Sequence, residues 1–255
     1  MRPYLAEFIG TALLILLGNG VVANVVLPKT KGSGSGWIVI TFGWGMAVFV
    51  AVWCVAEFSG AHINPAVTVG LAIAEKFPMA QVGRYIAAQM LGALTGAILM
   101  YLIYRDHYTA SDDGDAKLAT FATAPAIRNY PVNLLSEVVG TCVLVLAVLL
   151  VVDPSISMDR GDLSAAESGS LKIGLGTLGA LPVGLLVFAI GLSLGGTTGY
   201  AINPARDLGP RIAHALLPIP GKRDSDWAYA WVPIVGPILG AVLAVFVSYA
   251  LTLTD

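Results

Sequence analysis

Two copies of an Asn-Pro-Ala triplet are the residues of this sequence best suited to chemistry at a defined place. The copies are Asn64-Pro65-Ala66 and Asn203-Pro204-Ala205. Asn favours the capping position of a helix and Pro favours its first turn, so each triplet predicts a loop that ends in a capped helix. The Asn amides could donate hydrogen bonds to a small polar molecule, and the triplets offer no nucleophile.

Both triplets lie in strongly apolar sequence. Of the 255 residues, 56% are hydrophobic and 12% are charged, and the mean hydropathy is +0.79. This composition argues against a soluble globular domain and predicts a polytopic membrane protein. A polar loop at membrane depth is tolerated only where it is buried in protein or lines a water-filled cavity. The net charge of −2 gives no reason to expect a nucleic-acid partner.

Six apolar runs are long enough to cross a bilayer, which takes about 20 residues. They cover approximately residues 4–26, 37–56, 81–104, 133–152, 171–194 and 229–251. Two shorter helices are predicted at 64–74 and 203–216, and at about 1.5 Å per residue each covers roughly half of the ~30 Å hydrocarbon core. The expected fold class is an all-α membrane protein with six transmembrane helices and two re-entrant half-helices.

An internal repeat organises the chain. Ala-Glu-Phe-Ile-Gly-Thr at 6–11 opens the first half, and Ser-Glu-Val-Val-Gly-Thr at 136–141 opens the second. Each half has three spans, so the second half must start from the opposite face, and the repeats are inverted. We therefore predict a single transmembrane domain over 1–255 with repeats at approximately 1–105 and 132–255. The two polar loops are expected to meet near the midplane.

Three Glu residues lie in or beside the apolar runs, where carboxylates are functional candidates such as proton relays. Glu7 and Glu137 repeat together with the loops. This favours a structural role, in which each carboxylate accepts hydrogen bonds from the backbone N–H groups of a loop. Glu57 has no counterpart, and we expect it at the membrane edge.

Arg206 directly follows the second triplet. A charge at this depth costs about 2.5–3.5 kcal/mol, so the guanidinium must face protein or water. It could form a structural ion pair with Asp207 or serve as a donor that faces a pore. Val67, at the matching position of the first half, is apolar, which predicts one selectivity ring. His62 could either line the pore or brace the loop.

Enzyme and metal motifs carry little weight in this sequence. Residues 174–179 fit a dinucleotide-binding pattern and residues 191–195 fit a nucleophile elbow, but neither has the strand, turn and helix that its pattern requires. Asp clusters in 105–131 and 153–170 are more typical of solvated loops than of divalent-cation sites. Cys54 and Cys142 are expected to pack as small apolar residues. We expect no enzyme activity, catalytic residue, cofactor or bound metal.

The paired triplets, the inverted repeat and Arg206 resemble the aquaporin and aquaglyceroporin (major intrinsic protein) family over nearly the whole chain. The resemblance implies one pore per protomer, a homotetramer and a multi-pass protein of the plasma (inner) membrane with cytoplasmic termini. The distribution of Lys and Arg favours the opposite orientation.

Finer features are similar to the glycerol branch of that family. Trp44 lies twenty residues before Asn64, and Gly191 lies twelve residues before Asn203. The other features are Tyr200, Asp207, Arg211, Pro233 and Ile234. Water-selective members usually carry His where this sequence has Gly191. Tyr200 departs from the more familiar Phe, and its hydroxyl could narrow or polarise the constriction.

The resemblance implies a passive channel for glycerol, other small neutral solutes and water that excludes ions and protons. Its selectivity filter would comprise Trp44, Gly191, Tyr200 and Arg206, with Asn64 and Asn203 as central donors. The implied acceptor carbonyls are those of Gly60, Ala61, His62, Gly199, Tyr200 and Ala201. The alternatives are a water-selective channel of the same fold and an inverted-repeat secondary transporter; a membrane enzyme is more remote.

Overall fold

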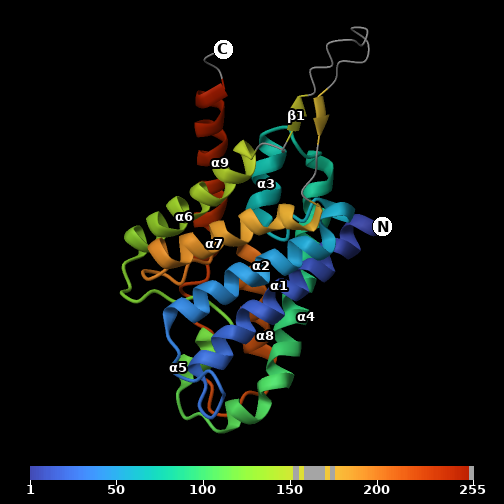
Figure 1. Ribbon diagram of the computed structural model, residues 1–255. Coiled ribbons are helices and arrows are strands. Elements are labelled where there is room, and N and C mark those ends of the chain that lie inside the picture. The colour runs from blue at the N-terminus through green and yellow to red at the C-terminus, as the bar shows by residue number, and fades with distance from the viewer. Residues whose placement is uncertain (152–154, 158–169, 173–175, 253–255) are drawn as a thin grey trace, which may run out of the picture.

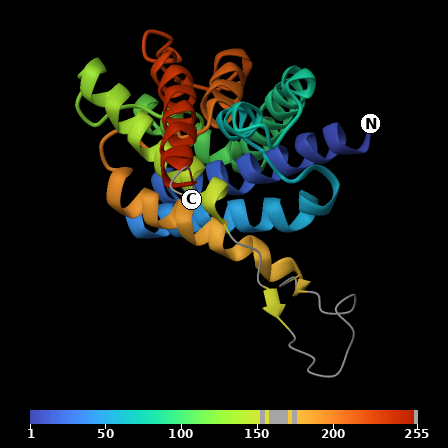
Figure 2. The ribbon, with the colours of Figure 1, turned by 90° about the horizontal axis from the view of Figure 1, so that it is seen from above.

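Long apolar helices make up most of the structure, a computed structural model that describes residues 1–151, 155–157, 170–172 and 176–252. Five of the described helices are long and apolar enough to cross a membrane. They are α1 (Arg2–Val26), α2 (Trp37–Ser59), α4 (Val82–Thr109), α6 (Tyr130–Leu150) and α9 (Val232–Thr252). Figures 1 and 2 show α1, α2 and the orange helix α7 (Leu181–Leu194) side by side.

The predicted span at 171–194 begins later than expected. Strand β2 (Ser170–Lys172) pairs antiparallel with β1 (Ser155–Ser157), and the 3₁₀ helix η2 (Gly176–Ala180) leads into α7, which has 14 residues. Pro182 lies in the first turn of α7, where its missing N–H costs no hydrogen bond. The acidic segment 153–170, predicted to be a solvated loop, lies outside the described residues except for 155–157 and 170.

Both triplets begin helices as predicted. Asn64 caps α3 (Pro65–Ile73), and its Oδ1 accepts from the N–H of Ala66. Asn203 caps α8 (Pro204–Leu216), and its Oδ1 accepts from the N–H groups of Ala205 and Arg206. Both Asn residues are extended, with φ of −157° and −155°. The two short helices therefore start where local capping chemistry places them.

The packing of the helices is reciprocal between the two halves. Helix α1 packs on α4, and its counterpart α6 packs on α9. The half-helix α3 of the first half packs on α9 of the second, while α8 packs on α4. Each half-helix is therefore held by the other half of the chain, and this arrangement brings the starts of α3 and α8 together.

Glycines stand at the helix crossings, where the two backbones approach each other closely. A methyl group at Gly96 of α4 would lie 2.4 Å from the carbonyl oxygen of Ala12 in α1. A methyl group at Gly240 of α9 would lie 2.4 Å from the carbonyl oxygen of Val138 in α6. These backbones approach one another so closely that a side chain has no room.

The connection at 105–131 is only partly the solvated loop that its Asp residues predict. The Asp side chains are exposed. After the short helix α5 (Gly114–Ala119), however, Phe121 and Thr123 are buried against the rest of the molecule. The backbone N–H and the hydroxyl of Thr123 both donate to Asp207 in α8, each over 2.7 Å. The segment thus packs over one end of the second half-helix.

Candidate functional site

The two loops that precede the half-helices have the same unusual backbone. Positive φ occurs at Ala61 (50°) and Ile63 (43°) in the first loop, and at Tyr200 (38°) and Ile202 (44°) in the second. Each loop also begins with a glycine of positive φ. A non-glycine residue in this region costs of order 1–3 kcal/mol and persists only when its surroundings enforce it. Something must therefore hold both loops in place.

Glu7 holds the first loop. Its Oε1 accepts from the N–H of His62 at 3.0 Å, and its Oε2 accepts from the N–H of Ile63 at 2.7 Å. Ser59 Oγ and Gln89 Nε2 also donate to this carboxylate, over 2.6 and 2.7 Å. Hydrogen bonds to an ionised acceptor are roughly twice as strong as neutral ones, so this buried carboxylate offsets much of the loop strain.

Glu137 makes the matching set of bonds in the second half. It accepts from the N–H groups of Ala201 and Ile202 at 3.0 and 2.8 Å, and from Thr198 Oγ1 at 2.7 Å. Glu137 is 1% exposed. Neither Glu7 nor Glu137 contributes to the walls of the two cavities described below.

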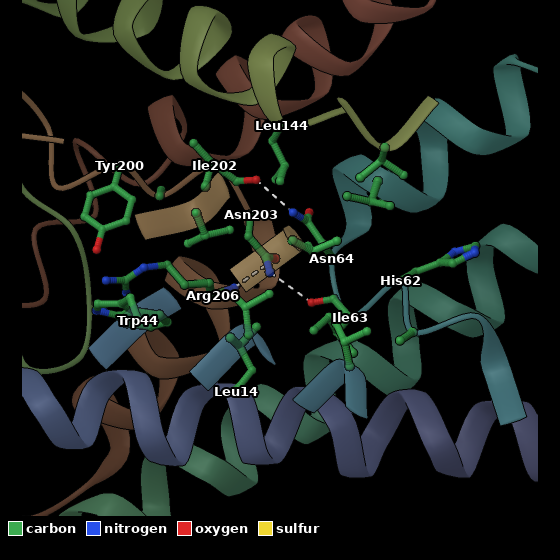
Figure 3. A pocket seen from close by; sticks show the side chains of 18 of the residues that line it. Leu14, Trp44, His62, Ile63, Asn64, Leu144, Tyr200, Ile202, Asn203 and Arg206 are labelled. Atoms are coloured by element: carbon green, nitrogen blue, oxygen red, sulfur yellow. Dashed lines mark hydrogen bonds between the residues drawn. The ribbon is translucent and has the colours of Figure 1, made fainter. Parts of the chain in front are cut away.

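The two loops are joined to each other through the Asn side chains (Figure 3). Asn64 Nδ2 donates to the carbonyl of Ile202 at 2.8 Å, and Asn203 Nδ2 donates to the carbonyl of Ile63 at 2.9 Å. An amide nitrogen carries two hydrogens. Because both Asn residues also line the central cavity, the second N–H of each is available to a molecule inside it.

The central cavity has a volume of about 150 Å³ and a wall of two kinds. One part comes from the two loops, from Gly60 to Asn64 and from Tyr200 to Asn203, and it holds the polar side chains of Asn64 and Asn203. The other part is apolar and comes from helices α1, α2, α3, α6 and α7. Its residues are Leu14, Val48, Val52, Val67, Leu71, Leu144, Val148, Val183 and Val187.

A second cavity, of about 380 Å³, adjoins the central cavity at three residues that belong to both walls. Trp44, Tyr200 and Arg206 line both cavities and are the residues that the two walls share. The guanidinium carbon of Arg206 lies 4.1 Å from the centre of the Trp44 ring. The second cavity is otherwise lined by parts of α1 and α2, by Ala119, by residues 122–126 and by Gly195, Gly196 and Gly199. Of the predicted carbonyl residues, Gly199 therefore lies on this side.

Arg206 does not form the ion pair with Asp207 that the sequence left open. Asp207 pairs with Arg211, at 2.7 Å from Nε and 2.9 Å from Nη2. Within the described part of the chain, the Arg206 side chain donates one hydrogen bond, from Nη1 to the carbonyl of Phe121 at 3.4 Å. Its other N–H groups remain for a ligand at the boundary between the cavities.

Gly191 is the predicted filter residue that the structure does not bring to either cavity wall. A Cβ atom at this position would lie 2.8 Å from Cζ of Tyr200. The Tyr200 ring therefore covers the glycine, and the absence of a side chain at 191 makes room for that ring. The family resemblance placed Gly191 at the constriction, but only side-chain packing shows which residue occupies the space.

His62 braces the loop with its ring. Nδ1 lies 3.1 Å from Thr68 Oγ1, and the ring packs edge-on against Phe77 at 4.6 Å between centroids. Figure 3 shows the imidazole directed away from Asn64 and Asn203. Glu57, which was expected at the membrane edge, is exposed near the end of α2.

Sequence reasoning missed several supporting residues. Ser59 and Thr198 carry a detectable signal, because each hydroxyl residue directly precedes the glycine that opens its loop. The Phe121 carbonyl carries none, since every residue has one. Outside the spans, Asp226 accepts two hydrogen bonds from Arg128, and these bonds raise the pKa of the Arg128 guanidinium.

Comparison with known proteins agrees with this architecture. The model of the major intrinsic protein family matches residues 1–248. The chain belongs to this family. Membership of this family and the five long apolar helices among the described residues together indicate that the protein is an integral membrane protein. The predicted family resemblance and fold class are confirmed, with one pair of three-residue strands beside the helices.

Relatives within the family are similar over almost their whole length. The chain is 59% identical to a probable glycerol uptake facilitator protein of Thermotoga maritima, over 95% of this chain and 96% of that one. It is 54% identical to the glycerol uptake facilitator protein of Streptococcus pneumoniae, over 97% of this chain and 98% of that protein. The X-ray structure of the aquaglyceroporin from Plasmodium falciparum matches with a TM-score of 0.80 and 31% identity, over 99% and 96%. The names of the two bacterial relatives describe facilitators of glycerol uptake.

Proposed function

We propose that this protein is a passive channel for glycerol and related small uncharged solutes, which also passes water and excludes ions and protons. The observation that carries the proposal is the wall of the central cavity, polar on one part and apolar on the other. Such a wall suits a solute with hydroxyl groups along one edge and C–H groups along the other. The names of the relatives at 53–59% identity support glycerol as the solute.

Each residue of the pathway has a role in this proposal. Trp44 and the Tyr200 ring contact the C–H edge of the solute at the constriction, while Arg206 donates to its hydroxyls. Loop carbonyls accept hydrogen bonds along the pathway, namely those of Gly60, Ala61, His62, Gly199, Tyr200 and Ala201. Asn64 and Asn203 donate at the centre. Hydrogen bonds to the protein then replace those to water, which keeps the desolvation cost of the solute low.

The proposed channel needs no covalent step, catalytic residue, metal or cofactor. Among the described residues, no group of three His, Cys, Asp or Glu is placed to hold a metal ion. A secondary transporter would need a coupling-ion site, and the buried carboxylates near the loops are already engaged. Loop N–H groups bind Glu7 and Glu137, and Thr123 and Arg211 bind Asp207. Glu7 and Glu137 thus favour the channel.

We further propose a homotetramer embedded in the lipid of the plasma (inner) membrane, with cytoplasmic termini. Large apolar side chains are exposed on many of the described helices, among them Leu5, Ile38, Leu91, Leu135 and Phe246. So large an apolar surface suits contact with lipid and with neighbouring protomers rather than water.

Stopped-flow light scattering on proteoliposomes tests the proposed function. After mixing with a glycerol gradient, vesicles that contain the protein should shrink quickly and then reswell much faster than empty vesicles. A matched sucrose gradient should give shrinkage alone. Rapid shrinkage with reswelling at the empty-vesicle rate would instead support the water-selective alternative. Glycerol flux that depends on an imposed ion gradient would support a transporter.

A further inference from the structure

Two exposed arginines stand at the neighbouring starts of α1 and α4 without an acidic partner. The guanidinium carbon of Arg84 lies 6.0 Å from the centre of the Tyr4 ring, and Arg2 precedes Tyr4 by two residues. Among the described residues, every ion pair is formed by other groups. Two like charges at neighbouring helix starts repel each other unless an anion binds beside them.

Aromatic packing holds Arg84 in place. The rings of Tyr4 and Tyr85 meet edge to face, with 5.8 Å between their centroids, and the Tyr85 hydroxyl donates to the carbonyl of Ser59 at 3.0 Å. A contact with the face of an aromatic ring leaves the N–H donors at the edge of a guanidinium free for an acceptor. Arg84 is therefore prearranged to bind an oxyanion such as a phosphate.

Arg84 lies at the level expected for lipid head groups. Arg84 and Arg105 are 21 residues apart in α4, with no charged residue between them. At about 1.5 Å per residue they are about 32 Å apart, close to the ~30 Å thickness of the hydrocarbon core. Leu91 and Leu102 follow Arg84 by about two and five whole turns, so they share its face, and they are 60% and 56% exposed. The Arg84 side chain thus leaves the helix on the face suited to lipid.

The fold itself does not require this positive charge. Gly92 of α4 and Gly240 of α9 each face a carbonyl of the helix packed on them, and aligning the two glycines places Val232 at the position of Arg84. An uncharged residue therefore fills the same position in the second half. Neither α1 nor α4 has an acidic residue in its first turn or a side-chain cap, so the positive ends of both helix dipoles add to the charge.

We propose that Arg2 and Arg84 form a binding site for the phosphate of an anionic phospholipid, in the leaflet on the N-terminal side of the protein. The phosphate accepts hydrogen bonds from both guanidinium groups, and the acyl chains lie along the exposed leucines of α4. The exposed acids that follow α3 and end α2, Glu75 and Glu57, form no ion pair with either arginine. Neither arginine lines a cavity, so the site is separate from the proposed solute pathway.

Native mass spectrometry of the detergent-solubilised protein tests this inference by titration with phosphatidylglycerol and, separately, with phosphatidylcholine. The parent should bind phosphatidylglycerol more tightly. Arg84→Gln should weaken the binding of phosphatidylglycerol about fivefold, which corresponds to about 1 kcal/mol for one basic residue near a membrane surface, and the double variant with Arg2→Gln should weaken it further. The affinity for phosphatidylcholine should stay the same. Arg84 is exposed, so the variant should fold.

Arg105→Gln is the matched control. It removes the same charge from the other end of the same helix, where Asp106 follows directly, and its affinity for phosphatidylglycerol should equal that of the parent. Equal binding of both lipids by the parent, or an equal loss in Arg84→Gln and Arg105→Gln, would overturn the inference. Displacement of the lipid by inorganic phosphate at the same concentration would also overturn it, in favour of a site for free phosphate. Glycerol flux is measured separately in vesicles, so any of these results would leave the proposed function standing.

Discussion

At the scale of single residues, the site depends on balancing strain against charged hydrogen bonds. Ala61, Ile63, Tyr200 and Ile202 hold a backbone conformation that costs of order 1–3 kcal/mol each. The carboxylates that oppose this cost bind the N–H groups of these loops directly. Outside the two loops, positive φ also occurs at Lys29, Glu75 and Asp226. The same pairing in each half explains why a Glu opens each repeat.

Glu137→Gln should destabilise the folded protein by about 1.5–3 kcal/mol, the worth of a hydrogen bond to a charged group. Glu137 accepts on both oxygens, so a Gln side chain must turn its NH₂ group toward one of the donors. The detergent-solubilised protein should lose its folded size-exclusion peak at a lower temperature than the parent. The protein that survives should keep the parental ratio of glycerol to sucrose response.

Glu57→Gln serves as the control because Glu57 is exposed, and its heat stability should match the parent. Unchanged stability in Glu137→Gln, together with a new dependence of glycerol flux on a pH gradient, would contradict the structural role and support a proton relay.

At the scale of elements, glycines decide how closely the helices cross. The α1–α4 and α6–α9 pairs correspond between the halves. In both pairs a glycine of the second helix faces a backbone carbonyl of the first, and a Cβ added to that glycine would lie 2.4 Å from the carbonyl oxygen. These crossings position α1 and α6, which supply Glu7 and Glu137. Any separation of the helices would therefore move the carboxylates that hold the loops.

Gly96→Ala should destabilise the protein by about 1–3 kcal/mol, because the methyl group forces α4 away from Ala12 of α1. Gly83→Ala is its control in the same helix, since a Cβ there meets no atom within 4 Å. The control should be neutral or gain up to about 1 kcal/mol from helix propensity. Thermal stability in detergent measures both variants, and an equal effect of the two would rule out close packing as the cause.

At the scale of the whole molecule, the inverted packing brings two helix N-termini to one point. The capping residues of α3 and α8 bond to each other's loops, so the positive ends of both helix dipoles face the same cavity. Arg206 adds a full positive charge at the neighbouring boundary. The electrostatic field along the pathway therefore opposes cations, while a neutral solute experiences little of it.

We expect the pathway to exclude protons and potassium ions while it passes glycerol. A cation would lose much of its hydration at the boundary and meet a positive field there. The measurement is the current across planar bilayers under a pH or potassium gradient, at a protein density that gives glycerol flux in vesicles. Sustained single-channel conductance under these conditions would contradict the expectation.

The sequence alone determined the features that arise from local chemistry. Apolar runs, caps at Asn64 and Asn203 and the repetition of Glu7 and Glu137 are properties of short segments, so hydropathy and capping rules predict them. The paired motifs were also sufficient to indicate the family. Helix α7 starts later than the span predicted at 171–194. Pro182 lies in its first turn, a position that favours a helix start and that hydropathy does not show.

The tertiary structure decided the features that depend on which side chains and backbone groups pack against one another. Asp207 pairs with Arg211, Arg206 reaches the Phe121 carbonyl, and the Tyr200 ring covers Gly191. A backbone carbonyl has no signature in the sequence, and a glycine does not reveal which neighbour fills the space beside it. The family resemblance therefore indicated which residues to expect at the constriction, whereas packing determined which atoms form its wall.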